Sequence, residues 1–492
     1  MQTILDKSIL IQQRKDLPIT GEALRALPCR ILQFGNGVLL RGLPDYYVDQ
    51  ANKNGVFNGL IVVVKTTDGN LDDFRKQDYL YTHSIKGYLH GEVCEKMEIN
   101  ASIHKVLAAS EDWEQILTYA SDPAVNIIIS NTTEQGILYV EEKIRGAVPQ
   151  SYPGKLLAYL FQRHLSLGPT HESKVVVLPT ELVDRNGDKL KTILAALAEY
   201  NGLSADFRAW LRTEVTICNT LVDRIVSGKP VAEKLANYFA ALKYQDHYLI
   251  ESEPFNLWAI EGPSALKETL GFSKGNDGIK IVEDIAVYKE LKLRLLNATH
   301  TFCAGVALIM DLPTVAVAMK DPLFIEFVTT LMADIQESIT SPIADEEKAA
   351  FASSVLDRFQ NPHIQHFWSA IIFSYSEKFL VRCMPLISAY YQIHGQFSAS
   401  MVKGFAAYFR VAIPDAVVED TYYATVNGVQ ITLNDPKSKE LLELKQQYGI
   451  AATIQQQLKS FFSPNEDTEM QKLLVQSVLA DYLNLVQLQT IS

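Results

Sequence analysis

The sequence predicts an α/β protein with an N-terminal Rossmann-like, doubly wound sheet and a mainly α-helical C-terminal domain. Short runs that are apolar throughout recur in the first half, as the strands of a parallel sheet covered on both faces require. Segments with apolar residues at helical spacing separate these runs, and such alternation is typical of doubly wound sheets. After about residue 285 the strong patterns are helical only. We therefore expect one domain over residues 1–284 and a second over residues 285–492.

The individual elements follow from the apolar pattern in chain order. Four β-branched runs of strand length lie at Arg30–Phe34, Leu60–Lys65, Asn126–Ser130 and Lys174–Thr180. Helical stretches in the same half lie at Trp113–Ala120, Lys155–Leu165 and Asp188–Tyr200. The loop Gly271–Gly278, rich in Gly, Ser, Asn and Asp, suits a domain boundary. Later helical patterns lie at 289–302, 325–339, 347–359, 438–449 and 469–483, and no strand-like run of comparable strength is predicted among them.

Charge and composition exclude several classes of function. The chain carries 45 Lys and Arg against 57 Asp and Glu, so it lacks the cationic excess of a nucleic-acid binder. Five scattered cysteines without a CxxC pair fit a reducing cytoplasm. The longest apolar run, Phe302–Met310, is far shorter than the roughly 20 residues of a membrane span, and no signal peptide is visible. We expect a cytoplasmic monomer or small homo-oligomer with no nucleic-acid or membrane partner.

A glycine-rich turn follows the first predicted strand and precedes a helical pattern, in the segment Phe34, Gly35, Asn36 and Gly37. In a dinucleotide-binding fold the first glycine permits the tight turn, and the second lets backbone N–H groups approach the pyrophosphate at a helix N-terminus. The third glycine of the usual GxGxxG pattern is replaced by Leu40. The alternative interpretation is an ordinary strand–helix turn without a ligand.

The end of the second strand, Leu60–Lys65, bears on the choice of cofactor. An acidic residue there binds the ribose 2′-hydroxyl of NAD and repels the 2′-phosphate of NADP. Asp68 lies a few residues beyond the strand, whereas Lys65 lies closer to it. The sequence therefore favours NAD(H), with Asp68 at the ribose.

The segment KELKLRLLNATH carries Lys292, Asn297 and His300 at offsets that suit chemistry. At about 100° per residue, the three fall within roughly 140° of one another and span about 12 Å of an α-helix. A lysine flanked by leucines could act as a general acid and base, an asparagine could donate a hydrogen bond to a carbonyl, and the histidine could position a hydroxyl. The alternative is a domain-joining helix with a snorkelling lysine and two satisfied polar side chains.

Several separated segments together resemble one family. FGNGVLLRG, QDYLYT, SNTTEQG, NTLVDRI and KLRLLNATH resemble the polyol-specific long-chain dehydrogenase/reductase family, the mannitol dehydrogenase group, from about residue 28 to at least 390. PTELVDRNGD, SYPGKL and RFQNPHIQH resemble its tagaturonate-reducing branch. This resemblance implies an NAD(H)-dependent enzyme that reduces the ketone of tagaturonate to altronate in hexuronate catabolism, without a metal ion.

The resemblance also implies roles for residues. Lys292 would be the general acid and base, Asn297 would polarise the carbonyl, and His300 would orient the substrate. Asp223 and Lys378 fall at substrate-binding positions of the family. The residues expected beside the cofactor and cleft, in addition to the glycine-rich turn, are Arg41, Asn131, Thr132, Thr133 and Glu134.

Three departures from the polyol members point to an acidic substrate. Leu182 stands where they have a second oxyanion-stabilising asparagine, and no arginine near Ala370 matches their substrate-binding arginine. Lys289 stands where they have glutamate, about 60° from Lys292 and 20° from His300 on an α-helix. We expect Lys289 to pair with the carboxylate of a sugar acid; the alternative is a solvated lysine at the domain junction.

Other functions compete with this interpretation. His363 and His366 are spaced as a pair of zinc ligands, but no cysteine or carboxylate at ligand spacing accompanies them. A non-catalytic sugar- or nucleotide-sensing protein would share the fold, although the intact lysine, asparagine and histidine argue against lost catalysis. Within the family, fructuronate reductase and mannitol 2-dehydrogenase differ from the predicted activity only in substrate.

Overall fold

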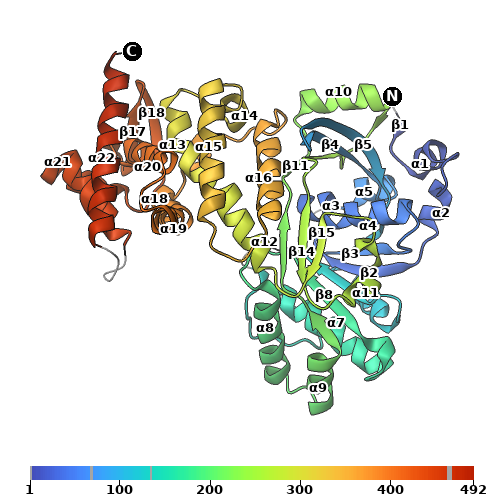
Figure 1. Ribbon diagram of the computed structural model, residues 1–492. Helices are drawn as coiled ribbons and strands as arrows, with labels where there is room; N and C mark the ends of the chain where they lie inside the picture. The colour runs from blue at the N-terminus through green and yellow to red at the C-terminus, as the bar shows by residue number, and fades with distance from the viewer. Residues whose placement is uncertain (1–2, 67–69, 133–135, 463–467, 492) are drawn as a thin grey trace. The chain divides into compact units, whose positions relative to one another are not determined.

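The computed structural model describes residues 3–66, 70–132, 136–462 and 468–491 (Figure 1). The chain forms two compact units. The N-terminal unit comprises Met1–Lys86 and Val93–Ile285, and the C-terminal unit comprises Gly87–Glu92 and Ala286–Ser492. Within the described residues, no helix is both long and apolar enough to cross a membrane.

A six-stranded parallel sheet forms the centre of the N-terminal unit and confirms the predicted Rossmann-like architecture. Its strands run in the order β6–β3–β2–β7–β8–β9, and each neighbouring pair is parallel. Numbered within this sheet alone, the order is the 3-2-1-4-5-6 of dinucleotide-binding folds, with the crevice for the ligand where the order reverses, between β2 and β7. The strands are β2 (Cys29–Phe34), β3 (Leu60–Lys65), β6 (Ile103–Ala108), β7 (Ile127–Ser130), β8 (Val175–Pro179) and β9 (Val215–Ile217).

Both faces of this sheet are covered, which explains the uninterrupted apolar runs. All residues of β3 are buried. Ile61 and Val63 contribute to the core on one face, and Val62 and Val64 to the core on the other, because successive side chains of a strand point to opposite faces. The helices that contribute to these two cores are α4 (Pro44–Lys53) for the first and α7 (Tyr152–Leu167) and α8 (Asn186–Tyr200) for the second.

Two smaller sheets in the N-terminal unit were not predicted. One has the strand order β11–β13–β4–β5 and the other the order β10–β14–β15. The residues of β5 are largely exposed and those of β4 are mostly polar or aromatic, so neither strand gives a continuous apolar run. The strands are β4 (Tyr81–Leu89), β5 (Glu92–Asn100), β10 (Thr220–Asp223), β11 (Val226–Gly228), β13 (Ile250–Ser252), β14 (Leu257–Glu261) and β15 (Ile279–Val282).

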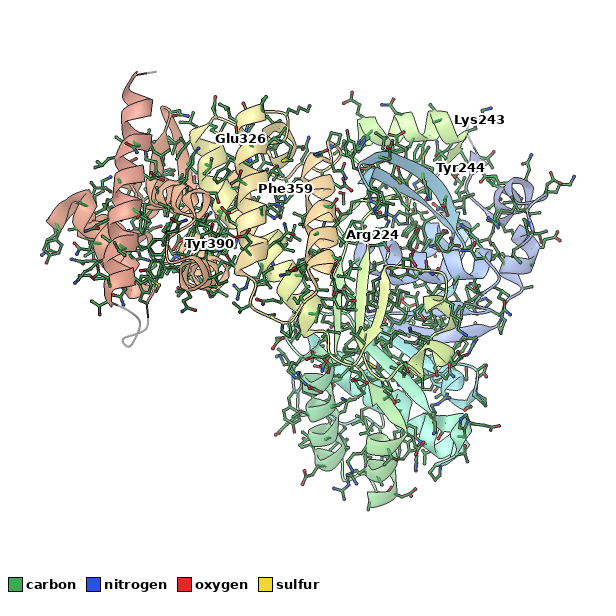
Figure 2. All side chains as sticks on the ribbon, in the orientation of Figure 1. Arg224, Lys243, Tyr244, Glu326, Phe359 and Tyr390 are labelled. Carbon is green, nitrogen blue, oxygen red and sulfur yellow. The ribbon has the colours of Figure 1, made fainter. Side chains whose placement is uncertain are left out.

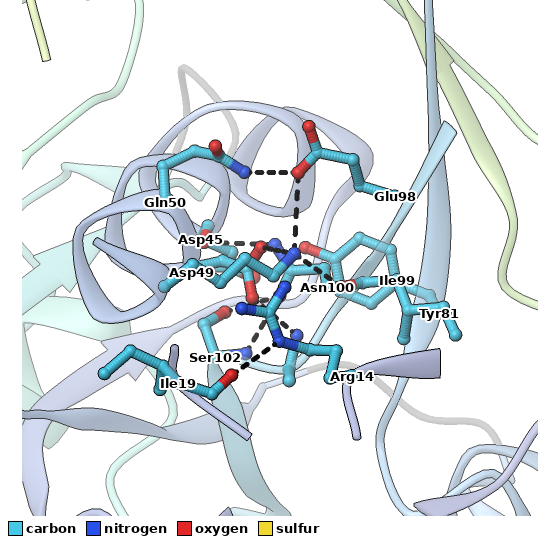
Figure 3. A network of polar contacts seen from close by, with 12 residues as sticks. Arg14, Ile19, Asp45, Asp49, Gln50, Tyr81, Glu98, Ile99, Asn100 and Ser102 are labelled. Atoms are coloured by element: carbon cyan, nitrogen blue, oxygen red, sulfur yellow. Dashed lines mark hydrogen bonds and ion pairs between the residues drawn. The ribbon is translucent and has the colours of Figure 1, made fainter. Parts of the chain in front are cut away.

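A buried polar network fixes α4 against the end of β5 (Figure 3). Lys53 pairs with Asp49 at 2.5 Å, and Asp49 also accepts a hydrogen bond from the Ala101 N–H at 2.9 Å. The side chain of Asn100 donates to the carbonyl oxygen of Asp45 at 3.1 Å. Complete burial raises the pKa of the Asp45 carboxyl to about 8. Because α4 follows the glycine-rich turn closely, this network helps to hold the turn in place.

The C-terminal unit is built around α13 (Thr299–Ile309), in which Thr299 to Ala307 are all buried. The helix α20 (Ala399–Ala412) approaches it so closely that a Cβ on Gly305 would lie 2.7 Å from the backbone of Ala407. The prediction of a mainly helical domain is therefore confirmed. The other long helices are α15 (Pro322–Ser338), α16 (Asp345–Gln360), α19 (Met384–His394), α21 (Ser438–Ser460) and α22 (Thr468–Ile491).

A small sheet after residue 285, where the sequence shows no strand-like run of comparable strength, was not predicted. A three-stranded antiparallel sheet consists of β16 (Ala416–Val418), β17 (Thr421–Val426) and β18 (Val429–Leu433). Asn427 and Gly428, both at positive φ, form the turn between β17 and β18. An Asn-Gly pair between two β-branched runs is a strong hairpin signal, because both residues accept the left-handed conformation of a type I′ turn.

Two π-helical segments occur in the C-terminal unit. The first, η5 (Lys292–Ala298), joins α12 (Ala286–Leu291) to α13. The second, η6 (Phe379–Cys383), joins α18 (Tyr375–Lys378) to α19. π-helical turns are rare and occur frequently at functional sites. The predicted regular α-helix over residues 289–302 is corrected accordingly.

Candidate active site

The glycine-rich turn has the geometry that a dinucleotide-binding turn requires. The Gly35 N–H donates to the carbonyl oxygen of Val64 at 2.9 Å. Gly35 has a φ of +110°, and a Cβ there would lie 2.8 Å from the carbonyl oxygen of Asn131, so only glycine fits. Gly37 begins α3 (Val38–Gly42), and a Cβ on it would meet no protein atom within 4 Å. Open space at Gly37 leaves room for the close approach of a ligand.

A cavity of about 660 Å³ lies beside this turn, at the carboxyl ends of β2 and β7. Gly35, Asn36, Gly37, Asn131 and Thr132 line it, so the structure brings together five of the predicted cofactor residues. The cavity lies at the reversal of strand order, where doubly wound sheets bind dinucleotides. Other lining residues are Thr66, Gly136, Leu138, Val140, Gln150, Ser151 and Tyr152.

The other predicted cofactor residues of the described chain, Phe34 and Arg41, do not line the cavity. Phe34 is fully buried, and its ring packs against that of Tyr152 at 5.2 Å between centroids. Arg41 is also buried, and its guanidinium donates to the carbonyl oxygen of Tyr248 at 2.7 Å and lies over the rings of Tyr81 and Tyr248. Arg41 thus anchors α3 inside the unit and is not among the residues that line the cavity. The three predicted residues that lie outside the described part of the chain are Asp68, Thr133 and Glu134.

Glu181 is a residue of this site that the sequence reasoning missed. It is 3% exposed, and its carboxylate accepts hydrogen bonds from the Thr132 N–H at 2.9 Å, the Thr132 hydroxyl at 3.0 Å and the Ser130 hydroxyl at 3.2 Å. Burial raises the pKa of this carboxyl. Asn131 donates to the carbonyl oxygen of Thr180 at 2.9 Å. The PTEL segment therefore fixes the backbone that follows β7, and this explains why its glutamate is polar yet buried.

Two further predictions concern the N-terminal unit. Leu182, at the position of the family's second oxyanion-stabilising asparagine, is 64% exposed. Asp223 ends β10 and is 7% exposed. The next residue, Arg224 (Figure 2), donates to the carbonyl oxygens of Glu253 and Gly42. This ties the NTLVDRI segment to the last residue of α3.

The predicted catalytic residues lie on η5 and the start of α13. π-helical hydrogen bonds join residues i and i+5, so Lys292 and Asn297 sit one turn apart on the same side of η5. Both are half-buried. His300 follows in the first turn of α13 and is 9% exposed. The sequence predicts a catalytic role for these residues, but their alignment in the structure comes from the π-helix and not from the assumed α-helical spacing.

His300 sits in an aromatic and cationic environment. Its ring stacks on Phe359 of α16 (Figure 2) at 4.3 Å and meets His366 edge to face at 4.9 Å. Burial, followed by the positive charges of His366, Arg358, Arg382 and Lys378, holds the pKa of His300 well below its usual range. The imidazole is therefore neutral, with one nitrogen able to donate and the other to accept a hydrogen bond.

Lys378 and Arg382 lie four residues apart, at the end of α18 and within η6. The Lys378 ammonium donates to the carbonyl oxygen of Ile371 at 2.9 Å, and the Arg382 guanidinium donates to the Thr301 hydroxyl at 3.4 Å. Burial and then the charge of Arg382 lower the pKa of Lys378. Lys289, the other predicted substrate residue, lies in α12 and is half-buried.

Arg294 connects the two π-helices. Its guanidinium donates to the carbonyl oxygens of Val381 and Arg382 at 3.1 and 2.9 Å and pairs with Glu290 at 2.9 Å. Tyr375 adds a second connection, since its hydroxyl donates to the Thr301 carbonyl oxygen. The segment carrying Lys292 and Asn297 is thereby fixed to the segment carrying Lys378 and Arg382.

His363 and His366, considered above as zinc ligands, belong to no larger group of metal ligands in the described residues. No group of three or more His, Cys, Asp or Glu side chains in that part of the chain is arranged to hold a metal ion. His366 instead faces His300, and His363 is exposed.

Comparison with known families assigns both units to the same family. A family model for the mannitol dehydrogenase Rossmann domain matches residues 29–274, and a model for the mannitol dehydrogenase C-terminal domain matches residues 284–486. The chain belongs to the mannitol dehydrogenase family. This membership, together with the relatives below, identifies an oxidoreductase that acts on CH–OH groups.

Within the mannitol dehydrogenase family, relatives of similar sequence bear the name altronate oxidoreductase. That of Halalkalibacterium halodurans is 35% identical over 385 residues, which are 77% of this chain and 74% of that protein. That of Bacillus subtilis is 35% identical over 382 residues, which are 77% of this chain and 79% of that protein.

Solved structures show the same fold over nearly the whole chain. Pseudomonas fluorescens mannitol 2-dehydrogenase, in a ternary complex with NAD and D-mannitol, gives a TM-score of 0.64 at 22% identity, covering 98% of this chain and 97% of that one. A substrate-free D-sorbitol dehydrogenase gives a TM-score of 0.74 at 18% identity, covering 98% of this chain and all of that one. The two-unit architecture is thus that of the mannitol dehydrogenase family.

Proposed function

We propose that the chain is an NAD(H)-dependent reductase of a keto sugar acid, which converts tagaturonate to altronate reversibly. The observation that carries this proposal is the set Lys292, Asn297 and His300, which η5 and α13 hold in the C-terminal unit beside Lys378 and Arg382. Relatives at 35% identity that bear the name altronate oxidoreductase support the choice of substrate.

The cofactor part of the proposal rests on the N-terminal unit. The Gly35 turn, the open space at Gly37 and the cavity between the ends of β2 and β7 fit a bound dinucleotide. The backbone N–H groups of Asn36 to Val38 would hold its pyrophosphate at the start of α3. NAD(H), when bound there, supplies or accepts the hydride.

The chain's own residues supply the rest of the chemistry. In the reduction, Lys292 gives a proton to the oxygen of the ketone as that carbon receives hydride, and in the oxidation it removes the hydroxyl proton. Asn297 donates a hydrogen bond to the same oxygen and stabilises its developing negative charge. Neutral His300 holds a neighbouring substrate hydroxyl. Asp223, Lys289 and Lys378 complete the proposed set of substrate-binding residues.

The experiment that tests the proposed function is a substrate and cofactor panel. Tagaturonate, fructuronate, fructose and tagatose are each assayed with NADH and with NADPH, and the nicotinamide absorbance is followed. We expect the highest kcat/KM with tagaturonate and NADH. Absence of turnover with every pair would favour a non-catalytic sensing role, and a preference for fructuronate or fructose would move the chain to a sister activity.

A single variant sharpens the choice between NADH and NADPH. We propose that Asp68 binds the ribose 2′-hydroxyl and repels a 2′-phosphate, so that Asp68→Ser narrows the preference for NADH. The dissociation constants of both cofactors are measured by fluorescence titration. An unchanged ratio of the two constants would assign ribose recognition to another residue.

A further inference from the structure

Arg382 is a half-buried cation whose hydrogen-bonding capacity is mostly unused. A guanidinium carries five N–H donors, and in the described residues Arg382 donates one hydrogen bond, to the Thr301 hydroxyl at 3.4 Å. No carboxylate oxygen of the described residues lies within 4 Å of it, nor of the Lys378 ammonium. Asp435 partly offsets the charge of Lys378, but two like charges in one half-buried place, with no carboxylate of the described chain in contact with either, are costly to fold.

The other arginines of the interior are treated differently. Arg163 donates to the carbonyl oxygens of five residues, and Arg224 donates three hydrogen bonds to those of Glu253 and Gly42. Arg294, on the neighbouring η5, has two carbonyl oxygens and the Glu290 carboxylate. Arg41 adds to its one hydrogen bond the faces of two tyrosine rings. Within the described residues, Arg382 has neither several carbonyl oxygens nor an aromatic face, and it stands apart from these four arginines.

The place of Arg382 explains the difference. It bonds to Thr301, which directly follows His300, and Lys378 lies four residues before it. The rings of His300 and His366 meet at 4.9 Å on the same side, and Arg358 of α16 adds a further positive charge nearby. The positive charge is thus concentrated beside the residue that orients the substrate in the proposed reaction.

We infer that Arg382 binds the carboxylate of the sugar-acid substrate, as a bidentate guanidinium–carboxylate pair with Lys378 alongside, and that this pair selects sugar acids over neutral ketoses. The inference rests on the proposed function and deepens it. Arginine suits this role because its planar fork matches the two carboxylate oxygens. Arg382 then takes the part first expected of Lys289, which lies on α12 before the π-helix.

The test compares a charged and a neutral substrate in Arg382→Gln. We expect kcat/KM for tagaturonate to fall about 10²-fold, mainly through KM, because a desolvated charge pair is lost. The kcat/KM for tagatose should stay within about threefold, since no carboxylate is present to lose its partner. Arg382→Lys keeps the positive charge but lacks the planar guanidinium, and its kcat/KM for tagaturonate should lie between those of the wild type and Arg382→Gln. Added guanidinium should restore part of the tagaturonate activity of Arg382→Gln.

Two further variants serve as controls. Glu377→Gln also changes the charge by one unit, in the opposite sense, at an exposed position of α18, and its ratio of tagaturonate to tagatose kcat/KM should equal that of the wild type. Lys289→Glu is the rival: if this variant loses tagaturonate selectively and Arg382→Gln does not, the carboxylate lies at Lys289 and the inference is overturned.

The remaining outcomes are separable. An equal loss for both substrates in Arg382→Gln would show a structural role and overturn the inference. Binding of altronate to the NADH complex, followed by fluorescence, provides a second measure of the same contact; unchanged affinity in Arg382→Gln would also overturn it. If the wild type turns over neither sugar acid with either cofactor, the proposed function itself fails, whatever Arg382 does.

Discussion

The two units of the molecule present their functional groups by different means. In the N-terminal unit the cavity lies at the backbone of the glycine-rich turn, Gly35 to Gly37, and its position follows from the order of six parallel strands. In the C-terminal unit the groups are side chains on two π-helical segments, η5 and η6, that Arg294 holds together. A site made of backbone depends on glycine and strand order, whereas a site made of side chains depends on helical register.

The first prediction tests the side-chain site at its centre. Lys292→Ala should lower kcat by about 10²–10⁴-fold, the usual contribution of a general acid and base. The dissociation constant of NADH should not change, because Lys292 is assigned to the substrate. Steady-state kinetics and fluorescence titration measure the two quantities, with exposed Lys320→Ala as the matched control. Turnover close to the wild-type value would remove Lys292 from its proposed role.

The second prediction tests the backbone site with a pair of glycines. Gly35→Val should abolish NADH binding and lower the melting temperature, because a Cβ there strains the backbone and meets the Asn131 carbonyl. Gly37→Ala should weaken NADH binding but leave the melting temperature unchanged, since the added Cβ meets no protein atom within 4 Å. If Gly37→Ala binds NADH normally, the pyrophosphate does not approach this residue.

The third prediction concerns the connection between the two π-helices. Arg294→Met removes two charge-assisted hydrogen bonds to η6 and should lower kcat about tenfold through misplacement of Lys292 and Asn297. NADH affinity should be unchanged. Glu290→Gln, which removes the ion pair and leaves both carbonyl contacts, should have a smaller effect. A fall in melting temperature without any change in kcat would show that Arg294 serves stability alone.

The sequence predicted the glycine-rich turn of the backbone site but not Glu181, which holds Thr132 in place, and it did not predict the helical register of the side-chain site. Leu60–Lys65 was predicted within its observed bounds because burial on both faces leaves an unbroken apolar run. The hairpin of β17 and β18 was missed because its exposed residues dilute the apolar signal, although the Asn-Gly turn was visible. Lys292 and His300 were found by residue type. Their register was not predicted, because the π-helical turn is accompanied by contacts between Arg294 and η6, which is distant in sequence.

The fourth prediction concerns stability in the N-terminal unit and leaves activity aside. The folded-state pKa of Asp45 is raised to about 8, well above that of an unfolded aspartate, so the folded state binds the extra proton. Its contribution to stability is therefore lost as the pH rises between about 4 and 8. Between these pH values the melting temperature of Asp45→Asn should fall less than that of the wild type. The melting temperature of Asp72→Asn, changed at an exposed residue, should fall as much as that of the wild type. Parallel curves for Asp45→Asn and the wild type would contradict the assignment.

The π-helix η5 has a consequence for insertions and deletions. A π-helical turn is an α-helical turn with one residue added. A helix that contains such a turn can therefore lose one residue there and become a regular α-helix. Deletion of Leu293 would allow η5 to relax to an α-helix without displacing α13, whereas the same deletion inside α13 would rotate every buried side chain that follows. The relaxed helix would set Lys292 four residues from the asparagine in place of five. At this point of the chain, the loss of one residue would therefore preserve the fold but abolish the proposed catalytic activity.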